Sequence, residues 1–100
     1  MPNVTNTQRQ HLRRLAHELR PVVQIGKQGL TASAHHAIDQ ALATHELIKI
    51  KFLDFQDQKE SLTDELVRVS ESVLIGLVGN VATVYREQPN PERRRIQLPE

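Results

Sequence analysis

PVVQIGKQGLT, residues 21–31, decides the fold because it predicts a strand, a turn and the start of a helix in immediate succession. Residues 22–25 are rich in β-branched side chains, which favour a strand, and Pro21 ends any helix before it. Glycines flank the turn at residues 26–29, and Thr31 is a suitable N-cap for the helix that follows. The stretch therefore begins a strand–helix–strand unit.

Apolar side chains recur at helical spacing on both sides of this stretch. Upstream, they predict an amphipathic helix over residues 5–19, with an inward stripe of Leu12, Leu15, Ala16 and Leu19. Downstream, they predict a second helix whose stripe is mostly alanine and can pack close to a neighbour: Ala34, Ala37, Ile38, Ala41 and Leu42.

Residues 47–52, LIKIKF, change to a period of two, which is typical of a strand with one buried face. Ile48, Ile50 and Phe52 point to one side, and Lys49 and Lys51 point to the other. We therefore expect a strand with a wet, cationic face.

The remaining chain predicts one more helix and a hairpin. The helix is expected over residues 57–72, with an acidic outer face and the inward side chains Leu62, Leu66, Val69 and Val73. Residues 73–78 and 81–85 are two strands joined by Gly79-Asn80, because both linking residues tolerate the positive φ of a tight hairpin.

The expected order is therefore α-β-α-β-α-β-β, in an α/β fold. The strand–helix–strand units require right-handed crossovers and some parallel pairing, whereas the last hairpin is antiparallel. We predict a single layered domain for residues 1–100, with a mixed four-stranded sheet and a core within residues 7–86. Residues 87–100 predict an irregular basic tail around residues 93–95, held by Ile96 and Leu98.

Charge is distributed unevenly along the chain although the net charge is only +1. Residues 1–51 carry seven basic and three acidic side chains, residues 52–85 two basic and six acidic, and residues 86–100 four basic and three acidic. All five histidines also lie in the basic half. The asymmetry indicates one face for a polyanion and another turned away from it, with chance clustering on solvated helices as the alternative.

Composition excludes several classes of function. The chain has no cysteine, which excludes disulfide scaffolds, thiolate metal sites and thiol catalysis. The first residues contain no apolar signal core and no stretch approaches a membrane span, so we expect a cytoplasmic protein with no membrane partner. No histidine pair has metal-ligand spacing, and the carboxylates fall on an exposed helix, so we expect no metal, no cofactor and no catalytic residue.

The turn Gly26-Lys27-Gln28-Gly29 is the candidate binding site. Its glycines let the backbone approach a ligand closely, and the N-terminus of the following helix favours an anion. Lys27 adds a full positive charge. The spacing is neither that of a P-loop nor that of a dinucleotide fingerprint, so the pattern indicates a phosphate cradle, with a purely structural turn as the alternative.

Three sequence blocks resemble those of the CRM domain, which is named for chloroplast RNA splicing and ribosome maturation. They are residues 19–31, LRPVVQIGKQGLT, residues 45–51, HELIKIK, and Tyr85-Arg86 at the end of the last strand. The order and spacing match over residues 7–98, most closely as in the stand-alone bacterial YhbY-like proteins. The resemblance implies a fold similar to the C-terminal domain of bacterial translation initiation factor three. It also implies RNA binding, and in bacterial members an association with precursors of the large ribosomal subunit.

The resemblance also implies which residues contact RNA, namely Gly26, Lys27, Gln28, Gly29, Lys49 and Lys51. The first helix adds further candidates, Arg9, Arg13 and Arg14; for Arg13 and Arg14 the alternative role is a solvated helix flank. For Lys49 and Lys51 the alternative is that they are edge-strand charges that block aggregation. Family members often have Gly-Lys in the last hairpin turn, whereas this chain has Gly79-Asn80, so we assign no RNA contact to that turn.

These observations predict a non-catalytic protein that binds ribosomal RNA of large-subunit precursors and has no small-molecule substrate. Because aromatic side chains are scarce, specificity should come from the shape of folded RNA more than from base stacking. The alternative is a protein–protein adaptor on the ribosome, in which the acidic third helix docks a basic protein and the glycine loop is only a turn.

Overall fold

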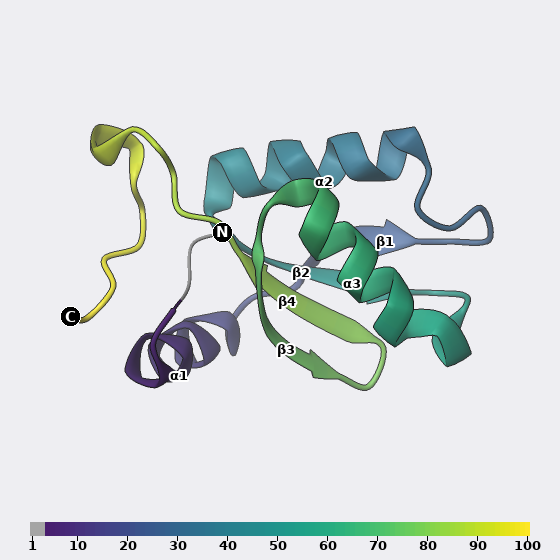
Figure 1. Cartoon of the computed structure of the whole chain (residues 1–100), viewed down its shortest axis with the longest axis horizontal. Coiled ribbons are helices and arrows are strands. Elements are labelled where there is room, and N and C mark those ends of the chain that lie inside the picture. The colour runs from purple at the N-terminus through teal and green to yellow at the C-terminus, as the bar shows by residue number, and fades with distance from the viewer. Residues whose placement is uncertain (1–3) are drawn as a thin grey trace.

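The computed structural model of the chain describes residues 4–100 and confirms the expected order of elements (Figure 1). The elements are α1 (Asn6–Ala16), β1 (Pro21–Ile25), α2 (Ala32–His45), β2 (Leu47–Phe52), α3 (Lys59–Ser70), β3 (Val73–Val78) and β4 (Val81–Tyr85), with short 3-10 turns η1 (Gln56–Gln58) and η2 (Pro91–Arg93). Helix α1 ends three residues earlier than expected. There the His17 N–H bonds to the Arg14 carbonyl and the Leu19 N–H to the Ala16 carbonyl, which turns the chain into β1.

The four strands form one mixed sheet in the order β1-β2-β4-β3. Strand β1 runs parallel to β2, and the β2–β4 and β3–β4 pairs are antiparallel, as expected. Strand β2 is therefore an inner strand, hydrogen-bonded on both sides. The alternative role of Lys49 and Lys51 as edge-strand charges is wrong, because no open edge exists at β2.

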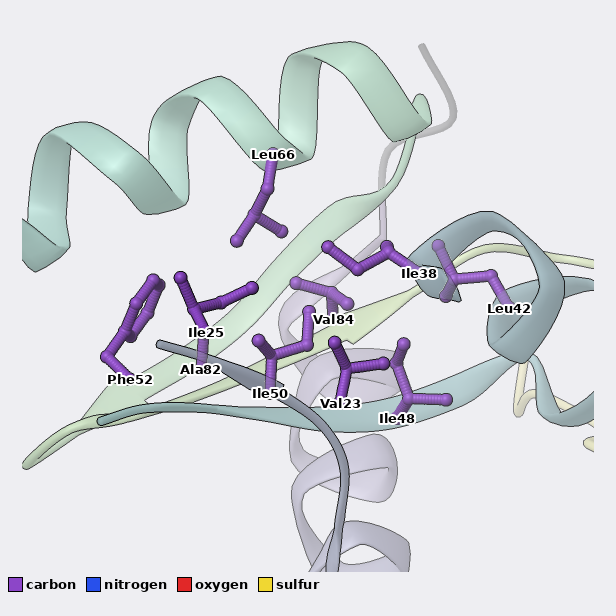
Figure 2. Close-up of a cluster of buried hydrophobic side chains, with 10 residues drawn as sticks. All are labelled: Val23, Ile25, Ile38, Leu42, Ile48, Ile50, Phe52, Leu66, Ala82 and Val84. Carbon is purple, nitrogen blue, oxygen red and sulfur yellow. The ribbon is translucent and has the colours of Figure 1, made fainter. Parts of the chain in front are cut away.

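The main core lies between the sheet and the helices α2 and α3 (Figure 2). Ile48, Ile50 and Phe52 point into it from β2, as the alternating pattern predicted, and meet Ile38 and Leu42 from α2. In Figure 2 helix α1 lies on the far side of the sheet from these side chains. Each fully buried side chain of this size contributes roughly 1.5–3 kcal/mol of transfer free energy. This layer therefore holds β1 and α2 together, and with them the loop that joins the two elements.

A second, smaller core covers the opposite face of the sheet. Leu12 and Ala16 of α1 pack against Leu47, Ile75 and Tyr85. Ile96 and Leu98 of the C-terminal segment pack against the same cluster, which confirms that they hold the tail. Only one end of this face is covered, because α1 is eleven residues long.

The inward face of α3 differs from the expected one. Val69 is 48% exposed, and Val73 lies in β3 and not in the helix. Leu66 is buried as expected, but the other buried positions are Thr63 and Ser70. The apolar pattern was misleading here because two buried positions are polar. The Ser70 hydroxyl donates to the Leu66 carbonyl at 2.6 Å, whereas the Thr63 hydroxyl has no hydrogen-bond partner within residues 4–100.

The C-terminal tail is held by a buried carboxylate that the sequence pattern did not reveal. Glu46 follows α2 with a positive φ of 66° and is 1% exposed. Its Oε2 accepts the N–H of Gln88 at 2.9 Å, and its Oε1 accepts those of Arg95 at 2.6 Å and Ile96 at 3.0 Å. Three main-chain donors therefore satisfy this anion and fix residues 88–96 against the domain.

Candidate nucleic-acid interface

The loop between β1 and α2 projects beyond the end of the sheet, on the opposite side of the molecule from the C-terminus (Figure 1). The Gly29 N–H donates to the Gly26 carbonyl at 3.0 Å, which closes the turn, and Gly29 has a φ of +71°. The side chains at the tip, Lys27 and Gln28, are exposed. Within residues 4–100, the main-chain N–H groups of Lys27 and Gln28 have no acceptor. Two amides and one ammonium are thus available to an external ligand.

The start of α2 adds further donors next to this turn. Thr31 is the N-cap, as expected, and its hydroxyl accepts the Ala34 N–H at 3.1 Å. The N–H groups of Ala32 and Ser33, in the first turn, have no intrahelical partner by the geometry of a helix. The helix dipole places partial positive charge at the same point. The loop and the helix start thus bring main-chain donors and one ammonium together, which is the geometry that an anion-binding cradle requires.

One side of the loop rests against the β2–α3 connection. A Cβ placed on Gly29 would lie 3.7 Å from Cε2 of Phe55, so the glycine and this ring are in near contact. The same connection carries Asp54 and Asp57, and Asp54 accepts the Phe55 N–H at 2.7 Å. A polyanion therefore meets lower repulsion if it approaches the loop from the other side, across the sheet face that α1 partly covers.

Lys49 and Lys51 lie on that sheet face. Both are half-buried, and neither has an acidic partner among the residues that the structure describes. Lys51 is opposite Gln24 of β1, two residues before the loop, and Lys49 is opposite Thr83 of β4. Alternate residues of a strand are about 6–7 Å apart, so the two ammonium groups form a row that leads from the loop towards α1.

The three arginines of α1 have different surroundings. Arg9 Nη1 donates to the Leu74 carbonyl, and Arg13 Nε donates to the Ile75 carbonyl at 3.2 Å. Both side chains therefore fasten α1 to carbonyl oxygens of β3. Arg14 is exposed and makes no ion pair within the described part of the chain. Arg9 is thus chiefly structural, whereas Arg13 keeps its remaining guanidinium donors and Arg14 keeps all of its donors.

The β3–β4 turn lacks a lysine of its own but has a cation beside it. Lys59, at the start of α3, donates its ammonium to the Gly79 carbonyl. The Asn80 side chain donates to the Phe52 carbonyl at 2.9 Å and fixes the turn to the end of β2. This contact could not be predicted from local sequence, because twenty residues separate Lys59 from Gly79.

No group of three or more His, Asp or Glu side chains among residues 4–100 is arranged to hold a metal ion. Burial, together with the carboxylates of Glu46 and Glu87, raises the pKa of Tyr85 to about 12, and Arg94 acts in the opposite direction. The phenol is thus protonated at neutral pH.

In the part of the chain that the structure describes, no helix is long and apolar enough to cross a membrane.

Comparison with known proteins agrees with this arrangement. Residues 4–86 match the family model of the CRS1 / YhbY (CRM) domain, which includes α1, the glycine loop and the whole sheet. The chain belongs to the CRM domain family. This confirms the resemblance drawn from the three sequence blocks.

Individual CRM proteins are similar over nearly their whole length. A Pseudomonas aeruginosa protein named a "probable RNA-binding protein", PA4753, is 36% identical over 91 residues, which are 90% of this chain and 88% of that protein. YqeI of Bacillus subtilis, named in the same way, is 35% identical over 97 residues, or 96% and 99% of the two chains. The solution structure of the hypothetical Staphylococcus aureus protein SAV1595 superposes with a TM-score of 0.79 at 35% identity and covers 97% of this chain and 100% of that one.

Proposed function

We propose that this CRM protein is a non-catalytic RNA-binding protein that holds the RNA backbone with the Gly26–Gly29 loop. The observation that carries the proposal is the pair of unpartnered N–H groups at Lys27 and Gln28, next to an exposed ammonium and a helix N-terminus. Such a combination suits phosphate oxygens, because several donors and a positive charge converge on one point. The names of the P. aeruginosa and B. subtilis relatives support RNA as the ligand.

The RNA that we propose is ribosomal RNA in precursors of the large ribosomal subunit. Support for this comes from the resemblance to the bacterial members of the family. The row formed by Lys49 and Lys51 would extend the footprint across the sheet, and Arg13 and Arg14 would extend it further at α1. We place this activity in the cytoplasm, where ribosomes of bacterial type are assembled.

Recognition should depend on charge and on RNA shape. Phe52 and Tyr85 are buried, and Phe55 is half-buried next to Gly29, so the chain offers no fully exposed aromatic ring as a stacking platform. Without such a platform, affinity rests on phosphate contacts, which carry little sequence information. The protein should therefore select folded RNA by its backbone geometry.

The test is the dependence of RNA affinity on salt for the wild type and for Lys27→Ala. The probe is in vitro transcribed large-subunit ribosomal RNA, and Arg68→Ala, an exposed cation on α3, is the matched control. Each phosphate contact contributes about 0.7–0.9 to the slope of log affinity against log salt, so Lys27→Ala should lower the slope by about that amount. Arg68→Ala should leave it unchanged.

The same series separates RNA binding from the adaptor alternative. If Lys27→Ala binds the RNA with unchanged affinity and slope, the loop is not the binding site. If the wild type does not bind RNA but binds basic ribosomal proteins, and Asp64→Lys on α3 abolishes that binding, the adaptor function is correct.

A further inference from the structure

A groove lies between the C-terminal end of α1 and the β3–β4 hairpin, on the same sheet face as the two lysines. Its volume is about 480 Å³. Three cationic or titratable side chains, Arg13, His17 and Lys49, line it together with apolar residues that include Ile75, Val78 and Val81. Of the described residues that line it, none is acidic. The groove therefore combines an apolar floor with a positive rim.

The positive groups of the rim have free donors. Arg13 uses Nε on the Ile75 carbonyl, and its other guanidinium nitrogens have no acceptor within residues 4–100. Lys49 makes no ion pair there, and the strand hydrogen bonds on both sides of β2 hold its backbone in place. An anion at this point would gain two charge-assisted contacts without displacing an existing carboxylate partner.

The outer part of the apolar floor is open to solvent, whereas Ile75 at its base is buried. Val78 is 80% exposed, although it ends an otherwise packed strand. Gly76 lies where the β3–β4 register shifts, and a Cβ placed on it would meet no atom within 4 Å. A glycine inside a strand often marks a point of close approach by a ligand, and here it leaves space in the groove.

We propose that this groove takes one unpaired nucleotide of the bound RNA, with its base on the floor formed by Ile75, Val78 and Val81 and its phosphate at Arg13 and Lys49. The proposal rests on the proposed function and deepens it. Splayed-out bases can be held between apolar side chains, and unpaired nucleotides in loops and bulges are the usual targets of specific RNA recognition. Cations line the rim and no carboxylate does, so the groove favours an anionic nucleotide over a peptide that has few acidic residues.

The position of the groove fits a single RNA path. Lys49 belongs both to the groove and to the row that leads through Lys51 to the glycine loop. Four residues of strand separate the level of Lys49 from the loop, about 13 Å at 3.3 Å per residue. A backbone gripped at the loop can thus place a nucleotide a few positions away in the groove.

The experiment compares two RNA hairpins that are identical except for one bulged uridine. Binding is measured by fluorescence anisotropy at 0.1 M salt. We expect the wild type to bind the bulged hairpin about tenfold more tightly, a difference of about 1.4 kcal/mol. Gly76→Val should remove this preference, because its side chain enters open space in the groove without altering any charge. A 4-thiouridine at the bulge should crosslink to residues 75–81.

Two further variants keep the result interpretable. Val78→Asn replaces an exposed side chain at a strand end, so the fold should persist, and it should also reduce the preference for the bulge. Lys27→Ala should weaken binding of both hairpins equally and leave their ratio unchanged. Failure of the proposed function would appear as no binding of either hairpin, or as no effect of Lys27→Ala. Equal binding of the two hairpins by the wild type, or an unchanged ratio in folded Gly76→Val, would overturn the groove proposal alone.

Discussion

Glu46 lies at the opposite end of α2 from the glycine loop. Replacing it by glutamine should lower the free energy of unfolding by about 2 kcal/mol. The carboxylate accepts three main-chain N–H groups, two at Oε1 and one at Oε2. Glutamine retains one acceptor oxygen, so Arg95 and Ile96 can keep their bonds while Gln88 faces an NH2 group. The main loss is one hydrogen bond to a charged group, worth about 1.5–3 kcal/mol, and the two retained bonds become neutral ones. The positive φ of Glu46 cancels from the comparison, because both side chains carry a Cβ.

Thermal unfolding and amide hydrogen exchange provide the assay. In a domain of this size, 1 kcal/mol shifts Tm by about 4–8 °C, so Glu46→Gln should lower Tm by about 8–16 °C. Exchange should accelerate most at the N–H group of Gln88, which loses its acceptor. The control is Glu87→Gln, which removes only the exposed ion pair with Arg94 at 3.1 Å and should cost less than about 1 kcal/mol. A Glu46→Gln protein with wild-type Tm and unchanged exchange would show that the carboxylate does not hold the tail.

Two other substitutions follow from single residues. Gly29→Val should weaken RNA binding and destabilise the fold by about 1–2 kcal/mol, because a φ of +71° is strained for a β-branched residue. Gly26→Ala is the control: Gly26 has open space around it and no positive φ, so the free energy of unfolding should not change. Urea titration of both variants measures the difference. Tyr85 ionises near pH 10 in the unfolded chain but near pH 12 when folded, so its contribution to stability is complete below pH 10 and is lost as pH rises to 12. Ultraviolet titration checks this directly, since Tyr85 is the only tyrosine and there is no tryptophan; a midpoint near 10 would contradict it.

The elements that could be predicted from sequence are those with one clean period. Residues 48–52 alternate strictly, so the core-facing side chains of β2 were predicted correctly, whereas Leu47 is buried on the opposite face and the two lysines there are half-buried. The glycines and Thr31 gave the turn and the helix cap, because these residue types have narrow local roles. The family blocks then placed these elements in a known order.

The rest depended on contacts between distant segments. Glu46 resembles any polar residue after a helix, and only the folded chain shows that amides some 42–50 residues away surround it. Arg9 was expected to face RNA, yet carbonyl groups of β3 satisfy it. The inward face of α3 was misassigned because Thr63 and Ser70 are buried while Val69 is not. The groove could not be predicted from the sequence either, because its lining residues come from α1, β2 and the β3–β4 hairpin.

The inner position of β2 limits how the protein can adapt to RNA. Backbone hydrogen bonds to β1 and β4 hold the Cα atoms of Lys49 and Lys51 from both sides, so their separation changes little with thermal motion. Any ordering on binding is then confined to the lysine side chains, each of which loses roughly 0.5–1.5 kcal/mol of conformational freedom. If the two lysines contact RNA as proposed, an RNA with the matching phosphate spacing should bind without backbone rearrangement at β2, and a mismatched RNA would itself have to deform.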